Sequence, residues 1–306
     1  MILVTSASGQ TGTRIIPHLV RRGVPVRGQV VRHESAAKIA ALGATPVVAS
    51  LRDAAAMHDA MRGVERIYHI APSLAYEEHE MGRVVLQAAC EAGVKHFVLH
   101  GVMAPYLQHL PFHWAKECMQ VDLFRSGMPY TVLMSTNYMQ NLSWTWPTIV
   151  ERGEWILPYS PDKRMTWLDL EDAAEAAANV LTEPGHEYAS YELCGTDSFL
   201  SRTEIAAMMT RTIGKPIRAV KIGIEEYLRQ ARQMPFFERF SEEEIGQIRA
   251  MFAEVDAYGL PAGNSRVLSM LLGRPAGSYA RFLERLAGSI ARGGASGSST
   301  TYGLPV

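Results

Sequence analysis

The sequence predicts an α/β fold: a doubly wound parallel sheet followed by a smaller, mostly helical C-terminal lobe. Two observations support this prediction. From residue 1 to residue 135, short apolar runs alternate with longer amphipathic ones, a pattern that is typical of repeated βαβ units. A glycine follows each amphipathic run, at the position where a left-handed residue ends a helix; these glycines are Gly23, Gly43, Gly63, Gly93 and Gly127.

The elements of this first part follow in order along the chain. Strands are expected at Ile2–Thr5, Pro25–Val31, Thr45–Ala49, Arg66–Ile70, His96–Leu99 and Tyr130–Leu133. Helices are expected between them, near Gly12–Arg22, Ser35–Leu42, Ala54–Met61, Tyr76–Ala92 and His113–Ser126. We therefore assign residues 1–135 to the sheet-forming domain.

The pattern changes after about residue 136. Residues 137–162 are rich in aromatic residues and proline and show no period. A helix over 170–182 and a strand over 188–194 are expected to return to the sheet. More helices are expected at 202–213, 224–232, 241–257 and 279–290. We therefore expect a C-terminal lobe over 136–290, and a disordered tail over 291–306 because this stretch is rich in glycine, serine and threonine.

Composition and charge narrow the class of function. The 306 residues carry a formal net charge of -1, which argues against a nucleic-acid or membrane-surface partner bound by bulk electrostatics. No apolar run approaches the roughly 18 residues that a membrane helix needs, and no basic segment precedes the first apolar run. The three cysteines stand far apart, outside the spacing of a disulfide framework or a metal site. We expect a cytoplasmic protein without a metal.

A glycine-containing turn joins the first expected strand to the first helix. Its spacing resembles GxxGxxG, with Ser6 in the first glycine position, followed by Gly9 and Gly12. Gly9 would let the backbone approach a pyrophosphate, which the amides at the helix start would hold, and Gly12 would let the helix pack closely on the strand. The candidate cofactor-binding residues of this turn are Ser6, Ser8, Gly9, Gln10, Thr11 and Gly12. The alternative is a glycine-rich turn without a ligand.

The end of the second strand indicates which dinucleotide would bind. An NAD site usually has an acidic residue there, to bond the ribose hydroxyls, but this strand ends Val30-Val31-Arg32-His33. The Arg32 guanidinium can pair with a 2′-phosphate, so the sequence favours NADP(H); the alternative is a solvated charge at a strand end. Arg52 could add a contact or be a surface residue. Ala71 and Pro72 are expected beside the adenosine ribose and the pyrophosphate.

Several segments, in this order, resemble the NmrA-like group of atypical short-chain dehydrogenases/reductases. The matching segments are 6–12, 30–32, 92–98, 126–133, 136–141, 167–174 and 273–282, so the resemblance spans about residues 1–290. It implies a Rossmann domain, a smaller C-terminal lobe and a preference for NADP(H). Members of the group reduce quinones, triphenylmethane dyes, imines and phenylpropanoid ethers, and others bind the dinucleotide without known turnover and act as redox sensors.

The catalytic pattern of standard short-chain dehydrogenases is incomplete in this chain. The lysine of their Tyr-x-x-x-Lys motif best matches Lys116, but the residue four positions earlier is Phe112, and the segment 99–102 lacks their serine. Lys116 is the candidate for bonding the nicotinamide ribose. His113 lies on the same helix face and is the candidate proton donor, since an imidazole has a pKa of about 6.5. The alternative is that His113 caps or packs the helix start.

The substrate side is less defined by the sequence. Asn137 follows the sixth expected strand, where the nicotinamide end of a cleft should open, and is a further cofactor candidate. The residues that could line a pocket for a flat substrate are Trp114, Tyr138, Met139, Trp155, Phe236 and Phe237. Each of them could instead belong to the core.

Three functions fit these observations. The first is an NADPH-dependent reductase of a small apolar aromatic or conjugated substrate, such as a quinone, imine, enone or dye, because such acceptors need little help from an acid. The second is a non-catalytic NADP(H) sensor that acts through a protein partner. The third is an NADP-bound isomerase or lyase. A homodimer is compatible with each.

Overall fold

The computed structural model describes residues 1–292 apart from 73, 76, 196–199, 233–239 and 261. The chain divides into two compact units. Unit 1 consists of Met1–Ser135, Leu170–Leu193 and Val267–Arg274, and unit 2 of Thr136–Asp169, Cys194–Arg266 and the described residues from Pro275 on. The predicted tail lies outside the described residues from position 293. None of the described helices is both long and apolar enough to cross a bilayer.

Unit 1 contains a parallel seven-stranded sheet with the strand order β11-β6-β5-β4-β1-β2-β3. Its strands are β1 (Ile2–Val4), β2 (Val26–Val30), β3 (Thr45–Val48), β4 (Arg66–His69), β5 (His96–Val102), β6 (Tyr130–Ser135) and β11 (Ala189–Leu193). The strand order reverses between β1 and β4, and ligands of such sheets bind outside the carboxyl ends of the strands at this switch point. The predicted α/β fold is confirmed.

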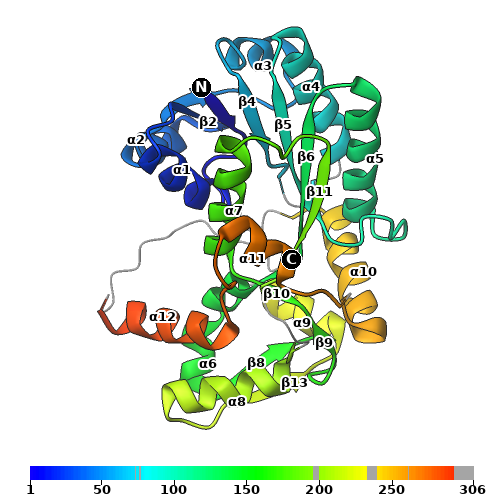
Figure 1. Ribbon diagram of the computed structural model, residues 1–306. Helices are drawn as coiled ribbons and strands as arrows, with labels where there is room; N and C mark the ends of the chain where they lie inside the picture. Colours follow the sequence, from blue (N-terminus) through cyan, green and yellow to red (C-terminus); the bar gives the residue numbers. More distant parts are fainter. Residues whose placement is uncertain (73, 76, 196–199, 233–239, 261, 293–306) are drawn as a thin grey trace. The chain divides into compact units, whose positions relative to one another are not determined.

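Helices cover both faces of this sheet (Figure 1). Helix α1 (Gly12–Arg21) packs against α7 (Leu170–Thr182), and α4 (Glu78–Glu91) packs between α3 (Ala54–Ala60) and α5 (Pro111–Ser126). Two short helices, η1 (His33–Ser35) and α2 (Ala36–Ala41), follow β2. The five glycines expected at helix ends all have a positive φ. Buried apolar side chains of α3, α4 and α5 pack on β1, β4 and β5, at roughly 1.5–3 kcal/mol for each large side chain.

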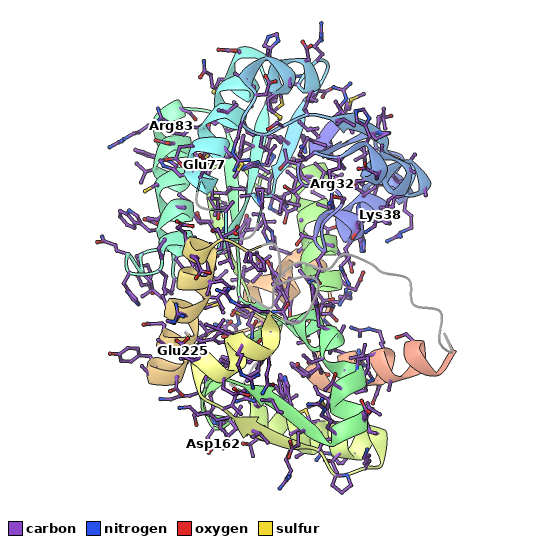
Figure 2. All side chains as sticks on the ribbon, turned by 180° about the vertical axis from the view of Figure 1, so that it is seen from behind. Arg32, Lys38, Glu77, Arg83, Asp162 and Glu225 are labelled. Atoms are coloured by element: carbon purple, nitrogen blue, oxygen red, sulfur yellow. The ribbon has the colours of Figure 1, made fainter. Side chains whose placement is uncertain are left out.

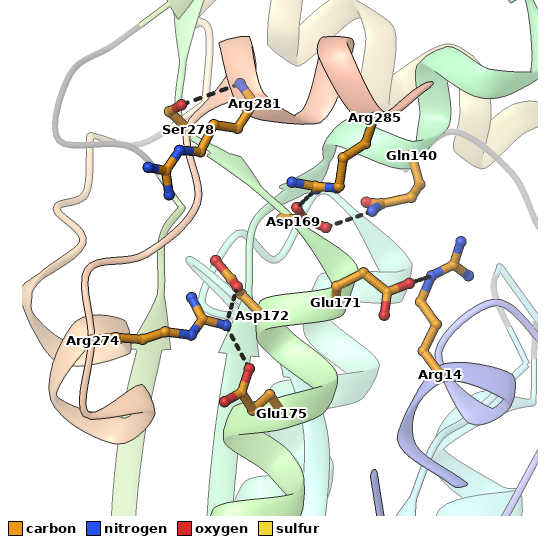
Figure 3. Close-up of polar contacts among 10 residues, drawn as sticks. All are labelled: Arg14, Gln140, Asp169, Glu171, Asp172, Glu175, Arg274, Ser278, Arg281 and Arg285. Atoms are coloured by element: carbon orange, nitrogen blue, oxygen red, sulfur yellow. Dashed lines mark hydrogen bonds and ion pairs between the residues drawn. The ribbon is translucent and has the colours of Figure 1, made fainter. Parts of the chain in front are cut away.

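Residues 267–274 belong to unit 1, although the sequence analysis assigned them to the C-terminal lobe. This segment contains most of α11 (Arg266–Leu272). Arg274 bridges the carboxylates of Asp172, at 2.8 Å, and Glu175, at 2.5 Å, both on α7 (Figure 3). Asn179 of α7 donates to the carbonyl of Leu271 at 2.7 Å. These contacts join residues about a hundred positions apart, which local patterns in the sequence cannot show.

The described part of unit 2 is mostly helical, with three pairs of short strands. The pairs are β7 (Asn137–Tyr138) with β10 (Trp167–Leu168), β8 (Glu154–Leu157) with β13 (Arg218–Lys221), and β9 (Arg164–Met165) with β12 (Leu200–Ser201). The helices are η2 (Met139–Trp144), α6 (Trp146–Arg152), α8 (Arg202–Ile213), α9 (Ile224–Ala231), α10 (Glu242–Tyr258) and α12 (Tyr279–Arg292). Helices α8 and α10 both begin with a capping box.

Two buried charged residues, Arg202 and Asp169, connect separate segments of unit 2. Arg202 is fully buried; its guanidinium donates to the carbonyls of Trp155 at 2.9 Å and Val220 at 3.2 Å, and so ties β8 to β13. Asp169 is also buried. Its carboxylate accepts from Gln140 at 2.6 Å and forms an ion pair with Arg285 (Figure 3).

Candidate functional site

The turn between β1 and α1 is held in place by a buried glutamine of β2. Gln29 is fully buried. Its side-chain carbonyl accepts from the amide of Ser6 and its backbone carbonyl accepts from the amide of Ala7, each at 2.9 Å. Its side-chain amide donates to the carbonyl of Ala49 at 2.5 Å. The backbone of the turn is therefore fixed without any ligand.

The backbone of this turn leaves little room for larger residues. Ser6 has a φ of 45°, in the left-handed region that a glycine would adopt more easily. A Cβ at Gly12 would lie 2.5 Å from the carbonyl oxygen of Ala7, and one at Gly9 would lie 3.2 Å from that of Ser6. Helix α1 therefore begins directly against the turn.

The start of α1 can hold an anion. The first amides of a helix have no acceptor within the helix, and the helix dipole makes this end positive. No acidic residue stands in the first turn of α1. The amides of Ser6, Ala7, Gly9, Thr13 and Arg14 already donate to oxygens of the protein. A diphosphate would therefore be held by the remaining amides of the turn and by the positive end of the helix, in the manner of other nucleotide-binding helices.

Three cationic side chains lie around this turn. Arg32 follows β2 directly and is exposed, whereas Lys38 of α2 is partly buried and donates to the carbonyl of Ser8 at 3.3 Å. Arg14 donates to the carbonyl of Gln10 at 2.8 Å and pairs with Glu171 at 3.0 Å. Burial, and then the charge of Arg14, lower the pKa of Lys38.

Arg32 and Lys38 form no ion pair with a carboxylate of the described chain. Both are marked in Figure 2. Because no acidic residue follows β2 before Glu34, the end of this strand presents positive charge where a dinucleotide's adenosine ribose would lie.

Arg52 is a surface residue. It follows β3, is exposed, and pairs with the exposed carboxylate of Glu77 at 2.5 Å. Ala71 and Pro72 follow β4 and are half-buried. They lie at the same edge of the sheet as the turn, since the carboxyl ends of parallel strands share one edge.

The β4 and β5 side of the edge carries a buried polar cluster. The ammonium of Lys116 on α5 forms an ion pair with Glu78, the first residue of α4. His69 of β4 lies 3.0 Å from the hydroxyl of Thr5 through Nδ1, and His100 of β5 lies 2.6 Å from that of Tyr68.

The imidazoles of this cluster are neutral at pH 7. Burial, and then the charge of Lys116, lower the pKa of His69 and of His100 to about 3 each. Burial also raises the pKa of the Glu78 carboxyl, against the opposing effect of the Lys116 charge. The ion pair of Lys116 and Glu78 is the ionic contact of the cluster.

His113 has an environment that favours a neutral ring. Its Nδ1 lies 2.9 Å from the carbonyl oxygen of Ala104, so this nitrogen carries the proton and donates it. Burial lowers its pKa to about 4. At pH 7 the Nε2 atom is then an acceptor. The lowered pKa counts against His113 as an acid, although the Ala104 carbonyl acts in the opposite sense, and that role stays a prediction.

The structure gathers the predicted cofactor residues of unit 1 at one edge of its sheet: the turn from Ser6 to Gly12, Arg32, Ala71, Pro72 and Lys116. Asn137 belongs to unit 2, where its side-chain oxygen accepts from Asn141 at 3.0 Å. Its role at a cofactor stays a prediction.

The predicted substrate residues are distributed over both units. Trp114 of α5 in unit 1 is 39% exposed. In unit 2, Tyr138 is half-buried, whereas Met139 and Trp155 are buried, as core residues would be. Phe236 and Phe237 lie outside the described residues. The substrate roles of all six stay predictions.

Lys38 and Glu78 were not predicted from the sequence. Lys38 stands six residues after Arg32, and a second cation so close to the end of β2 was a usable signal. Glu78 belongs to the run Glu77-Glu78-His79-Glu80. Nothing in that run distinguishes the one buried glutamate from its exposed neighbours.

Comparisons with known proteins bear on this site. The model of the NmrA-like family matches residues 1–278. The chain is 30% identical over 286 residues to the NAD(P)H azoreductase of Xenophilus azovorans, covering 93% of this chain and 97% of that protein. It is 30% identical over 296 residues to quinone oxidoreductase 2 of Escherichia coli, covering 94% and 98%.

Solved structures agree with the fold. The crystal structure of an NADPH-dependent quinone oxidoreductase from Escherichia coli, complexed with NADPH, matches with a TM-score of 0.80 at 28% identity, over 94% of this chain and 100% of that chain. The triphenylmethane reductase of Citrobacter sp. complexed with NADP(H) matches with a TM-score of 0.80 over 94% and 100% of the two chains. Its identity is 22%, so this likeness concerns the fold alone.

Proposed function

This chain belongs to the NmrA-like family, and from that we propose that it is an oxidoreductase that uses NADPH to reduce a small conjugated organic substrate. The observation that carries the proposal is the combination of an amide-lined turn with two cations, Arg32 and Lys38, at the end of β2. The NAD(P)H azoreductase and the quinone oxidoreductase among its relatives, and the matching structure of an NADPH-dependent quinone oxidoreductase, support it.

The residues of unit 1 fit the cofactor. The amides of the turn and of the start of α1 would hold the diphosphate. Arg32 and Lys38 would bind the 2′-phosphate, since a guanidinium and an ammonium both pair with phosphate oxygens. Lys116, on the β5 side of the switch point, would donate to the nicotinamide ribose.

The site favours substrates that need little acid catalysis. When bound, NADPH supplies a hydride. A quinone or an azo compound also takes up one proton, whereas a cationic triphenylmethane dye is reduced by the hydride alone. His69, His100 and His113 are neutral at pH 7, and Phe112 replaces the usual tyrosine. Quinones, azo compounds and triphenylmethane dyes accept a hydride into a conjugated system. We therefore place them ahead of simple ketones as substrates.

A substrate screen tests the function. NADPH oxidation would be followed by absorbance with quinones, azo dyes, triphenylmethane dyes, imines and enones, and with a simple ketone as the control. We expect turnover with at least one conjugated acceptor and none with the ketone. Tight NADPH binding without turnover of any acceptor would instead support the sensor. Substrate isomerisation or cleavage without net NADPH consumption would support the isomerase or lyase.

Charge reversal at the end of β2 tests the cofactor assignment. We expect Arg32→Glu and Lys38→Glu each to lower the affinity for NADPH about tenfold or more, because each variant brings a carboxylate to the 2′-phosphate. The affinity for NADH should change little. Titration of protein fluorescence with each dinucleotide gives both values.

Arg52→Glu is the matched control, because Arg52 is exposed and already paired with Glu77. Its ratio of NADPH to NADH affinity should stay that of the parent chain. An equal loss of NADPH and NADH affinity in Arg32→Glu would overturn the assignment.

The homodimer and the location in the cytoplasm stay predictions.

A further inference from the structure

Lys116 has one counter-charge among the described residues around it. Its side chain is 14% exposed and its ammonium pairs with Glu78. The charge of Lys116 helps to lower the pKa of the imidazoles of His69, His100 and His113, and all three rings are neutral at pH 7. An imidazole is either neutral or cationic, so none of these rings can balance the ammonium, and the Glu78 carboxylate is the counter-charge that holds it.

Glu78 is buried in a way that stability alone does not explain. Its side chain is 5% exposed. One carboxylate oxygen, Oε1, meets Lys116, while the other, Oε2, is buried without a hydrogen-bond partner among the described residues. A buried carboxylate with an unsatisfied oxygen costs free energy, and apolar replacements of such ion pairs are often neutral or stabilising.

Glu78 and Lys116 belong to different helices but form their ion pair at the carboxyl edge of the sheet. Glu78 begins α4, the helix after β4, and Lys116 lies in α5, the helix after β5. The start of α4 therefore lies at the carboxyl edge of the sheet, on the β4 side of the switch point, whereas Arg32 and Lys38 lie on the β2 side. An ion pair at this edge fixes a donor near the nicotinamide end rather than the adenosine end.

We propose that Glu78 is a positioning residue for the nicotinamide half of the cofactor: its Oε1 holds the Lys116 ammonium at the carboxyl edge of β4 and β5, from which Lys116 donates to the nicotinamide ribose. This inference rests on the proposed function. It assigns Glu78 a role that is exerted through Lys116 and not by direct contact with the substrate.

A double-mutant cycle tests the inference. The variants are Glu78→Gln, which keeps the shape of the side chain, Lys116→Met, and the double variant. Two ligands are titrated against each: NADPH and adenosine 2′,5′-bisphosphate, which lacks the nicotinamide half. We expect Glu78→Gln to weaken NADPH binding about fivefold or more and to leave binding of the bisphosphate unchanged. In the Lys116→Met background, Glu78→Gln should have no further effect on NADPH.

A purely structural role gives a different result. If Glu78 only stabilised the fold, its substitution would weaken both ligands alike, or would weaken NADPH equally with and without Lys116. Either result, or unchanged NADPH binding in Glu78→Gln, overturns the inference. Thermal unfolding without ligand reports the folded fraction, and the neutral double variant avoids leaving one charge unpaired if a single variant folds poorly.

Glu77→Gln is the control, because it makes the same chemical change one residue earlier on an exposed side chain. It should bind both ligands as the parent chain does. Failure of the proposed function looks different from failure of this inference. If the proposed function were wrong, the parent chain itself would not bind NADPH, or Arg32→Glu would not weaken the binding of both NADPH and the bisphosphate.

Discussion

His69, the last residue of β4, and His100, inside the neighbouring strand β5, are both buried, and burial lowers the pKa of each to about 3. In the unfolded chain an imidazole has a pKa of about 6.5. Between these values the unfolded chain binds protons that the folded chain does not. Stability is therefore lost as the pH falls below about 6.5, and the loss ends near pH 3.

This difference predicts a steep acid dependence of stability. Each of the two histidines should lower the free energy of unfolding by about 1.4 kcal/mol per pH unit below pH 6. Denaturant unfolding at pH 8, 7, 6 and 5 measures the slope, with the interval from pH 8 to 7 as the internal control. His100→Asn should reduce this slope by about 1.4 kcal/mol per pH unit, which is the contribution of one proton. An unchanged slope in this variant would contradict the assignment. Glu78, whose pKa burial raises, acts in the opposite sense at acidic pH.

Single residues of the site differ in how far the sequence reveals them. Arg32 was predictable because the end of the second strand of a nucleotide-binding fold is a defined position. Glu78 was not, because its partner Lys116 lies 38 positions away. The neutral state of His113 follows from burial, which lowers its pKa against the opposing effect of the Ala104 carbonyl, and no sequence pattern specifies this burial.

At the scale of elements, the turn between β1 and α1 depends on Gly12. A methyl group there would lie 2.5 Å from a backbone oxygen, and neither α1 nor the turn can yield easily because Gln29 fixes the turn. We expect Gly12→Ala to lower the free energy of unfolding by about 2 kcal/mol or more and to weaken NADPH binding. Chemical denaturation and NADPH titration measure the two effects.

Gly246 provides a matched comparison. It lies inside α10, and a Cβ at this position would meet nothing within 4 Å. We expect Gly246→Ala to raise stability by about 0.5–1 kcal/mol, the usual difference in helix propensity. If both variants changed stability by the same amount and sign, steric contact at Gly12 would not be the cause.

Whole helices were predictable where their ends carry chemical signals. Helix α8 occupies the predicted range of 202–213, and α10 differs by one residue at each end; both start at a serine with a glutamate three positions later. Strands of two residues, such as β7 and β10, are too short to show alternation. Their position depends on pairing partners far along the chain.

At the scale of the whole molecule, the sequence indicates that the chain returns to the sheet once, through α7 and β11. It does not indicate the second return at Val267–Arg274. That segment belongs to unit 1 through Arg274, Asn179 and their partners on α7 and α11. Such contacts form only in the folded structure and produce no periodic pattern in the sequence.

These two returns have a consequence for biosynthesis. Strand β6 leaves the ribosome well before β11, the neighbour that completes its side of the sheet, so the nascent chain presents an unpaired sheet edge while the first part of unit 2 is still being made. Exposed edges recruit foreign strands, and translation lasts long enough for such encounters. A protein fragment that ends at residue 135 would keep this sheet edge unpaired permanently. It would therefore be a poor substitute for the nucleotide-binding unit.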